Sequence, residues 1–185
     1  MLDQSKTLDV LDRFGASVKN TAKLNLKKKN KKASGRLINS IDYKINVSKN
    51  SFQFDLFAED YWAFVDYGVR GIGGTKKDGS KWKRKLVTNN KFKYRSTPKN
   101  NSNGRFLQSL NGWTIKRAIA PRGKDGRLQK RRGLLFAIRT SIIHTGIETT
   151  DFLTKPFEKE FKELPDELIE AYALDMDKFL EFTIQ

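Results

Sequence analysis

The sequence predicts an α+β fold in which a small antiparallel sheet is packed by an N-terminal and a C-terminal helix. Apolar residues recur at helical spacing near both ends of the 185-residue chain, over about residues 4–28 and from residue 154 onward. Between them, apolar and polar residues alternate over 43–47 and 52–56, which is the period of half-buried strands. A long basic stretch at 75–132 reads as an extended insertion into one domain that spans residues 1–185.

The N-terminal segment has the pattern of an amphipathic helix, because its apolar residues follow a spacing of three or four. They are Leu8, Leu11, Phe14, Val18 and Ala22. A basic run over 27–32 follows, and cations at this end favour the helix dipole. We expect a loop at 33–35 and then one or two helical turns over 36–41.

The two alternating segments form a predicted β-hairpin. Tyr43, Ile45 and Val47 alternate with polar residues in the first strand, and the apolar positions of the second strand continue the same pattern. Residues 49–51 are polar and predict the turn that joins the strands.

An aromatic segment at 60–68 follows the hairpin. Tyr61, Phe64 and Val65 fit one face of a short helix, with Asp60 as its N-cap. The glycines at 68, 71, 73 and 74 then interrupt regular structure. The Gly-Lys-Ser/Thr ending of a phosphate-binding loop is absent, so we expect a flexible hinge here.

Within the insertion, residues 82–94 suggest a weak basic hairpin, 106–115 a short helix, and 121–127 a loop. The apolar run at 134–143 fits either a buried strand or a helix. The last helix opens at Thr154 and Pro156, and Pro165 interrupts or restarts it. Its predicted apolar stripe consists of Leu168, Ile169, Tyr172, Ala173, Met176, Phe179 and Leu180.

Positive charge is the strongest compositional signal. Residues 1–150 carry 33 Lys and Arg against 11 Asp and Glu, whereas residues 151–185 carry 4 against 10. The densest stretch, 76–132, has 19 basic and 2 acidic residues. This density predicts a polyanion or an acidic protein surface as partner, the alternative being a solvated basic surface.

Several classes of protein are disfavoured. The chain has no cysteine, which excludes disulfides, thiolate nucleophiles and cysteine zinc sites. No apolar run approaches the roughly 20 residues that a membrane span needs, and the N-terminus lacks the layout of a secretory signal. We therefore expect a soluble intracellular protein with no membrane partner.

The sequence predicts no enzyme, metal or cofactor. The one histidine, His144, ends an apolar run, and no Gly-x-Ser-x-Gly segment supplies a nucleophile. A magnesium-dependent nuclease ranks last, because no acid-x-Lys triplet comes directly after the hairpin. Asp60 and Asp66 are expected as caps or solvent-facing residues. The acidic residues considered for metal binding were Asp42, Asp55, Glu59, Asp60 and Asp66.

The candidate site is a basic arm interleaved with aromatic residues. Its basic side chains can bind phosphates or an acidic partner, and its aromatic rings can either stack on bases or anchor the insertion. No sequence-specific nucleic-acid motif is present. The arm consists of Lys76, Lys77, Lys81, Trp82, Lys83, Arg84, Lys85, Lys91, Lys93, Arg95, Arg127, Lys130, Arg131 and Arg132, with Phe92 and Tyr94 as further aromatics.

Three short segments, in this order, resemble the tail-completion family of tailed bacteriophages, which are head–tail joining proteins similar to the minor tail proteins of lambda-like phages. Residues 34–41 resemble its x-Gly-Arg-Leu-x-x-Ser-Ile segment, and 61–68 its Tyr-Ala-x-x-Val-Glu-Phe-Gly segment. Residues 151–157 resemble the entry to its last helix. The matching residues are Gly35, Arg36, Leu37, Tyr61, Val65, Gly68, Phe152, Leu153 and Pro156.

The resemblance implies a structural virion protein, made in the host bacterial cytoplasm and placed in the neck. It implies a homo-oligomeric ring of about six or twelve copies that joins the portal to other neck or tail proteins, around packaged DNA. The large basic insertion departs from the family. The alternative function is non-specific nucleic-acid binding by residues 76–132.

Overall fold

The computed structural model describes residues 4–29, 35–48, 51–88, 91–95, 103–123 and 125–184. The predicted α+β fold, with a small antiparallel sheet and helices at both ends, is confirmed. The chain forms two compact units. Met1–Trp62 and Asp151–Gln185 make the terminal unit, and Ala63–Thr150 makes the central unit. The central unit contains the whole of the stretch at 75–132 that the sequence analysis treats as an insertion.

The terminal unit contains a two-stranded antiparallel sheet and helices from both ends of the chain. The strands pair from Asp42 opposite Phe57 to Ser48 opposite Ser51, which confirms the predicted hairpin. Residues 49 and 50 of its turn, and 33 and 34 of the predicted loop, lie outside the described residues. The elements are α1 (Ser5–Lys28), α2 (Arg36–Ser40), β1 (Asp42–Ser48), β2 (Ser51–Phe57), α6 (Thr154–Phe161) and α7 (Leu164–Ile184).

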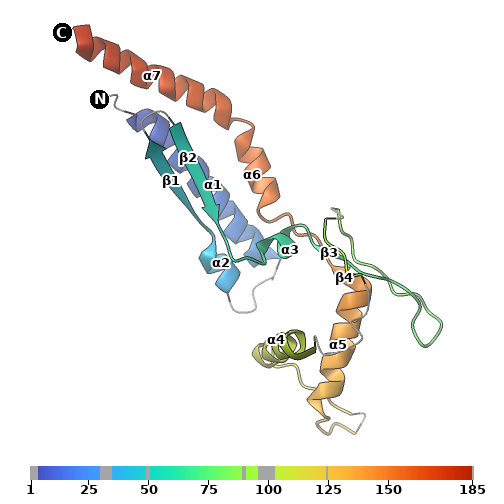
Figure 1. The fold of residues 1–185 in the computed structure, drawn as a ribbon. Helices are drawn as coiled ribbons and strands as arrows, with labels where there is room; N and C mark the ends of the chain where they lie inside the picture. Colours follow the sequence, from blue (N-terminus) through green and yellow to red (C-terminus); the bar gives the residue numbers. More distant parts are fainter. Residues whose placement is uncertain are drawn as a thin grey trace. The chain divides into compact units, whose positions relative to one another are not determined.

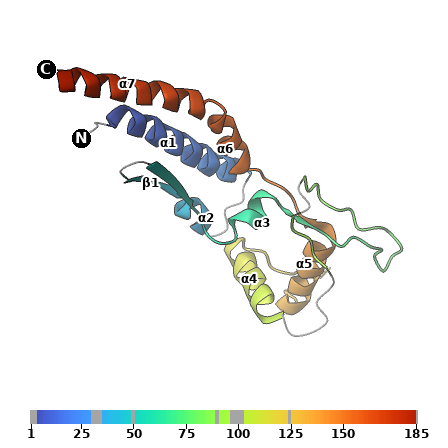
Figure 2. The ribbon, with the colours of Figure 1, turned by 45° about the horizontal axis from the view of Figure 1, so that its top comes forward.

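Helix α1 is the central layer of this unit, with the sheet on one side and α6 and α7 on the other (Figures 1 and 2). Its buried residue Phe14 touches both neighbours. The Phe14 ring lies edge-on to Phe54 of β2, with 5.2 Å between centroids, and edge-on to Phe157 of α6 at 5.5 Å. Edge-to-face packing of this kind adds to the free energy gained from burial.

Gly15 allows the sheet to approach α1 closely. A Cβ atom at this position would lie 2.5 Å from the Tyr43 ring and 2.8 Å from the Phe54 ring. These two rings stack on each other with 5.7 Å between centroids, so they form a flat surface against the glycine. The Tyr43 hydroxyl also donates a 2.7 Å hydrogen bond to Asp12 on α1, which raises the pKa of Tyr43 to about 12.

The first turn of α1 is capped by a residue from the last helix. Gln4, which precedes α1, makes no side-chain capping bond. Instead the fully buried carboxylate of Asp175 accepts hydrogen bonds from the Lys6 N–H (3.1 Å), the Thr7 N–H (2.9 Å) and the Thr7 hydroxyl (2.8 Å). Asp175 therefore satisfies donors that the start of a helix leaves unpaired, and its negative charge suits the helix dipole.

The capping contact explains why the predicted apolar stripe of α7 is wrong in part. The buried residues of α7 are Leu164, Ala171 and Asp175, whereas Ile169 is 69% exposed and Tyr172 is 46% exposed. The helix is rotated so that Asp175 faces α1, which turns the flank with Ile169 and Tyr172 to solvent. The side chains at 179 and 180 lie outside the described residues. The predicted restart at Pro165 is confirmed, because α6 ends at Phe161 and α7 begins at Leu164.

The central unit begins within α3 and contains a second, smaller antiparallel pair, Val69 opposite Ile147 and Arg70 opposite Gly146. The ambiguous run at 134–143 is helical, and its buried residues Leu135, Arg139 and Ile143 recur every four positions. Helix α4 packs on α5 and confirms the short helix predicted at 106–115. The elements are α3 (Trp62–Asp66), β3 (Val69–Arg70), α4 (Asn103–Lys116), α5 (Arg131–Thr145) and β4 (Gly146–Ile147).

The prediction that Asp66 faces solvent is wrong, because this residue is fully buried at the end of α3. The Thr150 N–H donates to the Asp66 carbonyl at 2.9 Å, and the Thr150 hydroxyl donates to the Val65 carbonyl at 2.6 Å. Asp60 is exposed and precedes the helix, which begins at Trp62. The end of α3 is thus held by a segment more than 80 positions later in the chain.

We predict that Asp175→Ala lowers the free energy of unfolding by about 2–3 kcal/mol, because it removes a helix cap and leaves buried donors unpaired. Urea unfolding followed by circular dichroism measures the change. Asp177→Ala removes the same charge from an exposed position on α7, and we expect a change within about 0.5 kcal/mol. Equal losses in the two variants would contradict the capping role.

We predict that Gly15→Ala destabilises the protein by about 1–3 kcal/mol through overpacking, although alanine is ordinarily the better helix former. The matched control is Gly112→Ala in α4, where an added Cβ meets nothing within 4 Å. That variant should gain up to about 1 kcal/mol. Thermal unfolding compares the two, and a stabilised Gly15→Ala variant would show that the sheet can move away from α1.

Candidate functional site

Charge is divided sharply between the two units. The central unit carries 21 Lys and Arg against 4 Asp and Glu, a net charge of +17. The terminal unit carries 16 against 17, a net charge of −1. All of the protein's excess positive charge therefore belongs to the central unit, which makes that unit the candidate surface for an anionic partner.

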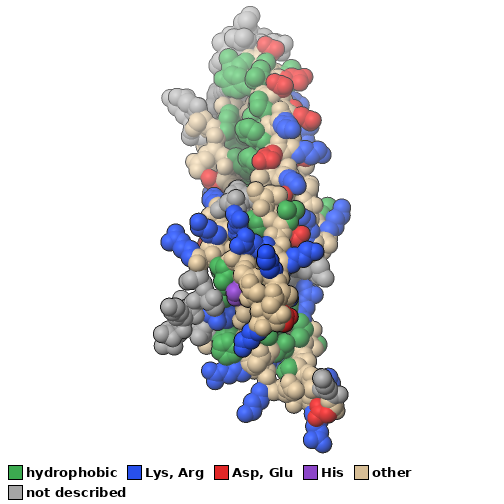
Figure 3. Space-filling model, turned by 90° about the vertical axis from the view of Figure 1, so that its right-hand side faces the viewer, with side chains coloured by type: hydrophobic (Ala, Val, Ile, Leu, Met, Phe, Trp, Pro, Cys, Tyr) green, Lys and Arg blue, Asp and Glu red, His purple; other side chains and the backbone are tan. Residues whose placement is uncertain are grey.

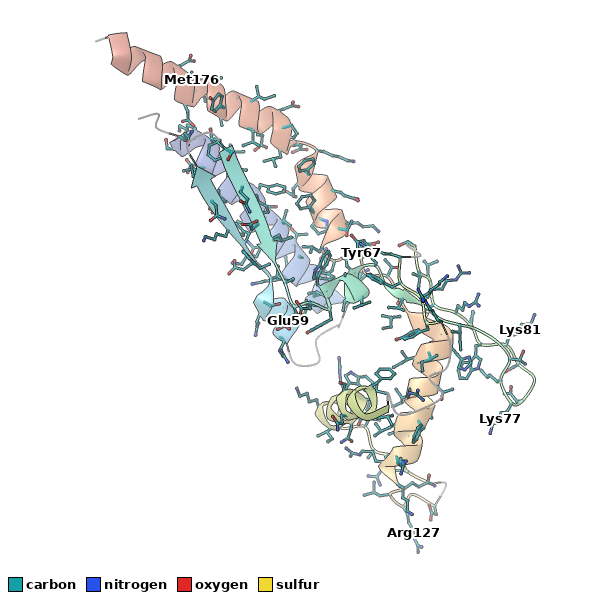
Figure 4. All side chains as sticks on the ribbon, viewed as in Figure 1. Glu59, Tyr67, Lys77, Lys81, Arg127 and Met176 are labelled. Atoms are coloured by element: carbon teal, nitrogen blue, oxygen red, sulfur yellow. The ribbon has the colours of Figure 1, made fainter. Side chains whose placement is uncertain are left out.

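The most prominent basic feature is a short hairpin at residues 74–82, which we call the basic hairpin. The Trp82 N–H donates to the Gly74 carbonyl at 2.9 Å, and the Lys76 N–H donates to the Ser80 carbonyl at 2.7 Å. Its exposed tip carries Lys77 and Lys81, shown in Figure 4, together with Lys76. The tip turns at Gly79, whose φ of +82° favours glycine.

The described residues of 82–94 show no backbone pairing with one another, unlike the predicted hairpin, whose residues 89 and 90 lie outside the described residues. Residues after Trp82 run instead beside the segment around β4. The Lys85 N–H donates to the Thr145 carbonyl at 2.8 Å, and the Thr149 N–H donates to the Leu86 carbonyl at 3.2 Å. These long-range backbone bonds replace the local pairing that composition suggested.

Trp82 anchors the basic hairpin to the end of α5. Its ring stacks on His144 with 5.1 Å between centroids and 16° between planes. His144 Nδ1 lies 2.5 Å from the Gly73 carbonyl oxygen, and because a carbonyl can only accept, Nδ1 carries the proton. The Lys76 ammonium lies 5.1 Å from the centre of the Trp82 ring. The only histidine of the chain is thus engaged in holding the hairpin.

The other two aromatics of the basic arm also make internal contacts. The Phe92 ring lies 4.5 Å from the Phe64 ring, and its backbone carbonyl accepts a bond from the Arg70 N–H at 2.9 Å. The Tyr94 N–H donates to the Arg70 carbonyl at 3.0 Å, and burial raises the pKa of Tyr94. These contacts favour the anchoring interpretation of the aromatics over base stacking.

The glycine-rich segment is closely packed, so the prediction of a flexible hinge is wrong. Gly71 and Gly73 are buried, and the Gly73 N–H donates to the His144 carbonyl at 2.9 Å. A Cβ at Gly71 would overlap that same carbonyl oxygen. The glycines are needed here because backbone from residues 68–73 passes directly against backbone from residues 144–149.

The structure places most of the predicted basic arm on the basic hairpin, which projects from the end of α5 (Figure 4), and on the segments that run beside β3 and β4. Figure 3 shows Lys and Arg side chains around the single histidine on this face. Arg84 is the one whose guanidinium also bonds to the Ile72 carbonyl, at 2.7 Å. The gathered basic residues are Lys76, Lys77, Lys81, Lys83, Arg84, Lys85, Lys91, Lys93 and Arg95.

Arg127, Lys130, Arg131 and Arg132 lie at the opposite end of α5, about 20 Å away along the helix. Arg127 is labelled in Figure 4 on the loop that precedes α5. No acidic residue occupies the first turn of α5, so this end places cations beside the positive end of the helix dipole.

Three of the five acidic residues proposed for metal binding, Asp42, Asp55 and Glu59, have side-chain partners in the fold. Asp42 pairs with Lys19 at 2.8 Å, and this hydrogen bond holds the pKa of Asp42 below its usual value. Asp55 accepts bonds from Asn46 and Gln53, both at 2.8 Å. Within the described part of the chain, no group of three His, Cys, Asp or Glu side chains could hold a metal ion.

The residues that carry the family resemblance mostly hold the fold. Gly35 has a φ of +78° directly before α2, and Leu37 is buried. Gly68 has a φ of +74°, and an added Cβ would lie 2.6 Å from the Ile147 carbonyl. Arg36 pairs with Glu59 at 3.5 Å, and the Val65 carbonyl accepts a hydrogen bond from the Thr150 hydroxyl. Phe152, Leu153 and Pro156 are buried, whereas Tyr61 is more exposed.

The terminal unit also has a groove that the sequence did not predict, which we call the acidic groove. It consists of two hollows of about 190 and 210 Å³ between α1 and the α6–α7 segment, and both are lined by Arg13 and Glu167. Periodicity could not reveal it, because it depends on the pairing of helices from opposite ends of the chain. Its acidic lining residues are Glu160, Glu163, Glu167 and Glu170, and its basic ones are Lys6 and Arg13.

Comparison with protein-family models, with curated proteins and with solved structures finds no match to this chain. Among the helices in the described ranges, none combines the length and the apolar character that crossing a bilayer requires.

We predict that Trp82→Ala destabilises the central unit by about 1–2 kcal/mol, because the ring loses its stacking and packing on His144. Leu86→Ala serves as the control, since Leu86 is 73% exposed on the segment that follows, and it should change stability by less than about 0.5 kcal/mol. Urea unfolding measures both. Unchanged stability together with weaker binding of single-stranded DNA would instead support base stacking by Trp82.

Proposed function

We propose that this protein is a non-catalytic structural subunit of a tailed-phage virion, which forms an oligomeric ring in the neck and joins the portal and head to the tail. The observation that carries the proposal is the division of charge. One chain presents a unit of net charge +17 and a second unit with an acid-lined groove. Unlike, complementary surfaces on one chain allow head-to-tail contacts, and such contacts form a ring where the rotation between copies closes.

The fold supports the proposal at a second level. The resemblance to the tail-completion family implies a small antiparallel sheet packed by terminal helices, and the terminal unit has this arrangement. In this chain the three resembling segments lie before β1, along α3 and at the entry to α6.

Exposed apolar side chains on α6 and α7 also favour assembly. Phe161, Ile169, Tyr172 and Leu174 are each between 46% and 69% exposed. Ile169 and Tyr172 are three residues apart on one flank of α7, and contiguous exposed apolar surface marks interaction sites. An assembled ring would cover them.

Non-specific nucleic-acid binding is the second candidate function, and the charge of the central unit favours it directly. The gathered lysines and arginines around β3 and β4 can neutralise phosphates without reading sequence. A neck subunit around a DNA channel would use the same surface, so the two candidates differ in whether assembly is required.

Native mass spectrometry and electron microscopy of the purified chain test the proposal at about 50 mM and about 0.5 M salt. We expect closed rings at low salt and dissociation at high salt, since charged contacts are screened. A chain that stays monomeric and binds DNA tightly, with affinity falling steeply as salt rises, would support the second candidate instead.

A further inference from the structure

We infer that the acidic groove of one copy receives the basic hairpin of the next copy. The inference rests on the proposed ring and names the two surfaces that would build it. Both are described on the same chain, one in the terminal unit and the other in the central unit.

The groove has an apolar floor and a largely acidic lip. Val10, Phe14, Leu164 and Ala171 form the floor and are buried, while Leu174 is 48% exposed at one end. The four glutamates outnumber the two cations on the α1 side. One of the glutamates, Glu167, already pairs with Arg13 at 3.5 Å, so the other three lack a neutralising ion pair among those described. A polyanion would be repelled here, and a cationic protein segment would be attracted.

The basic hairpin has the opposite charge to this groove, and internal hydrogen bonds hold its tip in one conformation. Its tip exposes Lys76, Lys77 and Lys81, and the Asp78 carboxylate accepts bonds from the Ser80 N–H (3.0 Å) and hydroxyl (2.6 Å). The tip is therefore preformed and loses little conformational entropy on docking. Glu163 directly precedes α7 and Glu170 lies on it seven residues later, about 10 Å along the helix axis, a span that lysines on a hairpin can match.

We assign a second copy of the chain to the groove, because the positive hairpin of one copy can neutralise the negative groove of the next. Each chain supplies one positive tip and one negative groove, so every contact that is made leaves one free surface of each kind for the next copy. This is the condition for a heterologous ring. Nucleic acid is the competing partner for the hairpin, but it offers no occupant for the groove.

Charge reversal on each surface tests the inference by native mass spectrometry at low salt. The groove variant is Glu160→Lys with Glu163→Lys and Glu170→Lys, and the hairpin variant is Lys76→Glu with Lys77→Glu and Lys81→Glu. We expect each alone to associate at least about tenfold more weakly than the wild type. An equimolar mixture should assemble again with the two variants in a 1:1 ratio, since the hairpin of each variant is complementary in charge to the groove of the other, and a chain with both reversals should also assemble again.

The matched control is Glu158→Lys with Asp166→Lys and Asp177→Lys, which changes the same number of acids outside the groove and should assemble like the wild type. Circular dichroism verifies folding. Because the chain has no cysteine, Glu170→Cys and Lys77→Cys chains can also be mixed, and a disulfide between them reports the contact without charge reversal.

A groove variant that assembles like the wild type overturns the inference and leaves the ring proposal standing. A hairpin variant that loses DNA binding but still assembles assigns the hairpin to nucleic acid and also overturns it. A wild-type chain that stays monomeric, with no 1:1 co-assembly in the mixture, removes both proposals.

Discussion

The buried carboxylate of Asp175 is the contact on which the terminal unit depends. It caps the first turn of α1 from the last helix of the chain, through bonds to Lys6 and Thr7. A helix start needs such acceptors, and Gln4 supplies none. The contact sets the rotation of α7, and through it the buried face, the exposed apolar flank and the groove along α1.

Helix α1 packs against the sheet on one face and against α6 and α7 on another. Phe14 fills the space toward both β2 and α6, and Gly15 withholds a side chain so that the Tyr43 and Phe54 rings can approach. Because both ends of the chain meet on this helix, the terminal unit is complete in itself. A whole second unit can be inserted between Trp62 and Asp151 without interrupting that core.

The central unit carries the excess positive charge, and its fold is held by backbone hydrogen bonds between segments distant in the chain. Buried glycines allow the segments around β3 and β4 to lie against each other, and Trp82 stacks on His144 at the same end of α5. The aromatic and imidazole groups serve as anchors, which leaves the lysine and arginine side chains exposed for a partner. This separation of anchoring and charge agrees with the binding role that we propose for the surface.

The sequence by itself determined the α+β class, the β-hairpin, the terminal helices, the restart at Pro165 and the basic stretch, because periodicity, turn residues and charge are local properties. Only the tertiary structure decided the helical state of 134–143, the burial of Asp66, the packing of the glycines, the place of the basic hairpin and the rotation of α7. Each depends on a partner far away in the chain, such as Thr7 for Asp175, which lies 168 positions earlier. The acidic groove has the same origin, since helices from the two ends of the chain line it together.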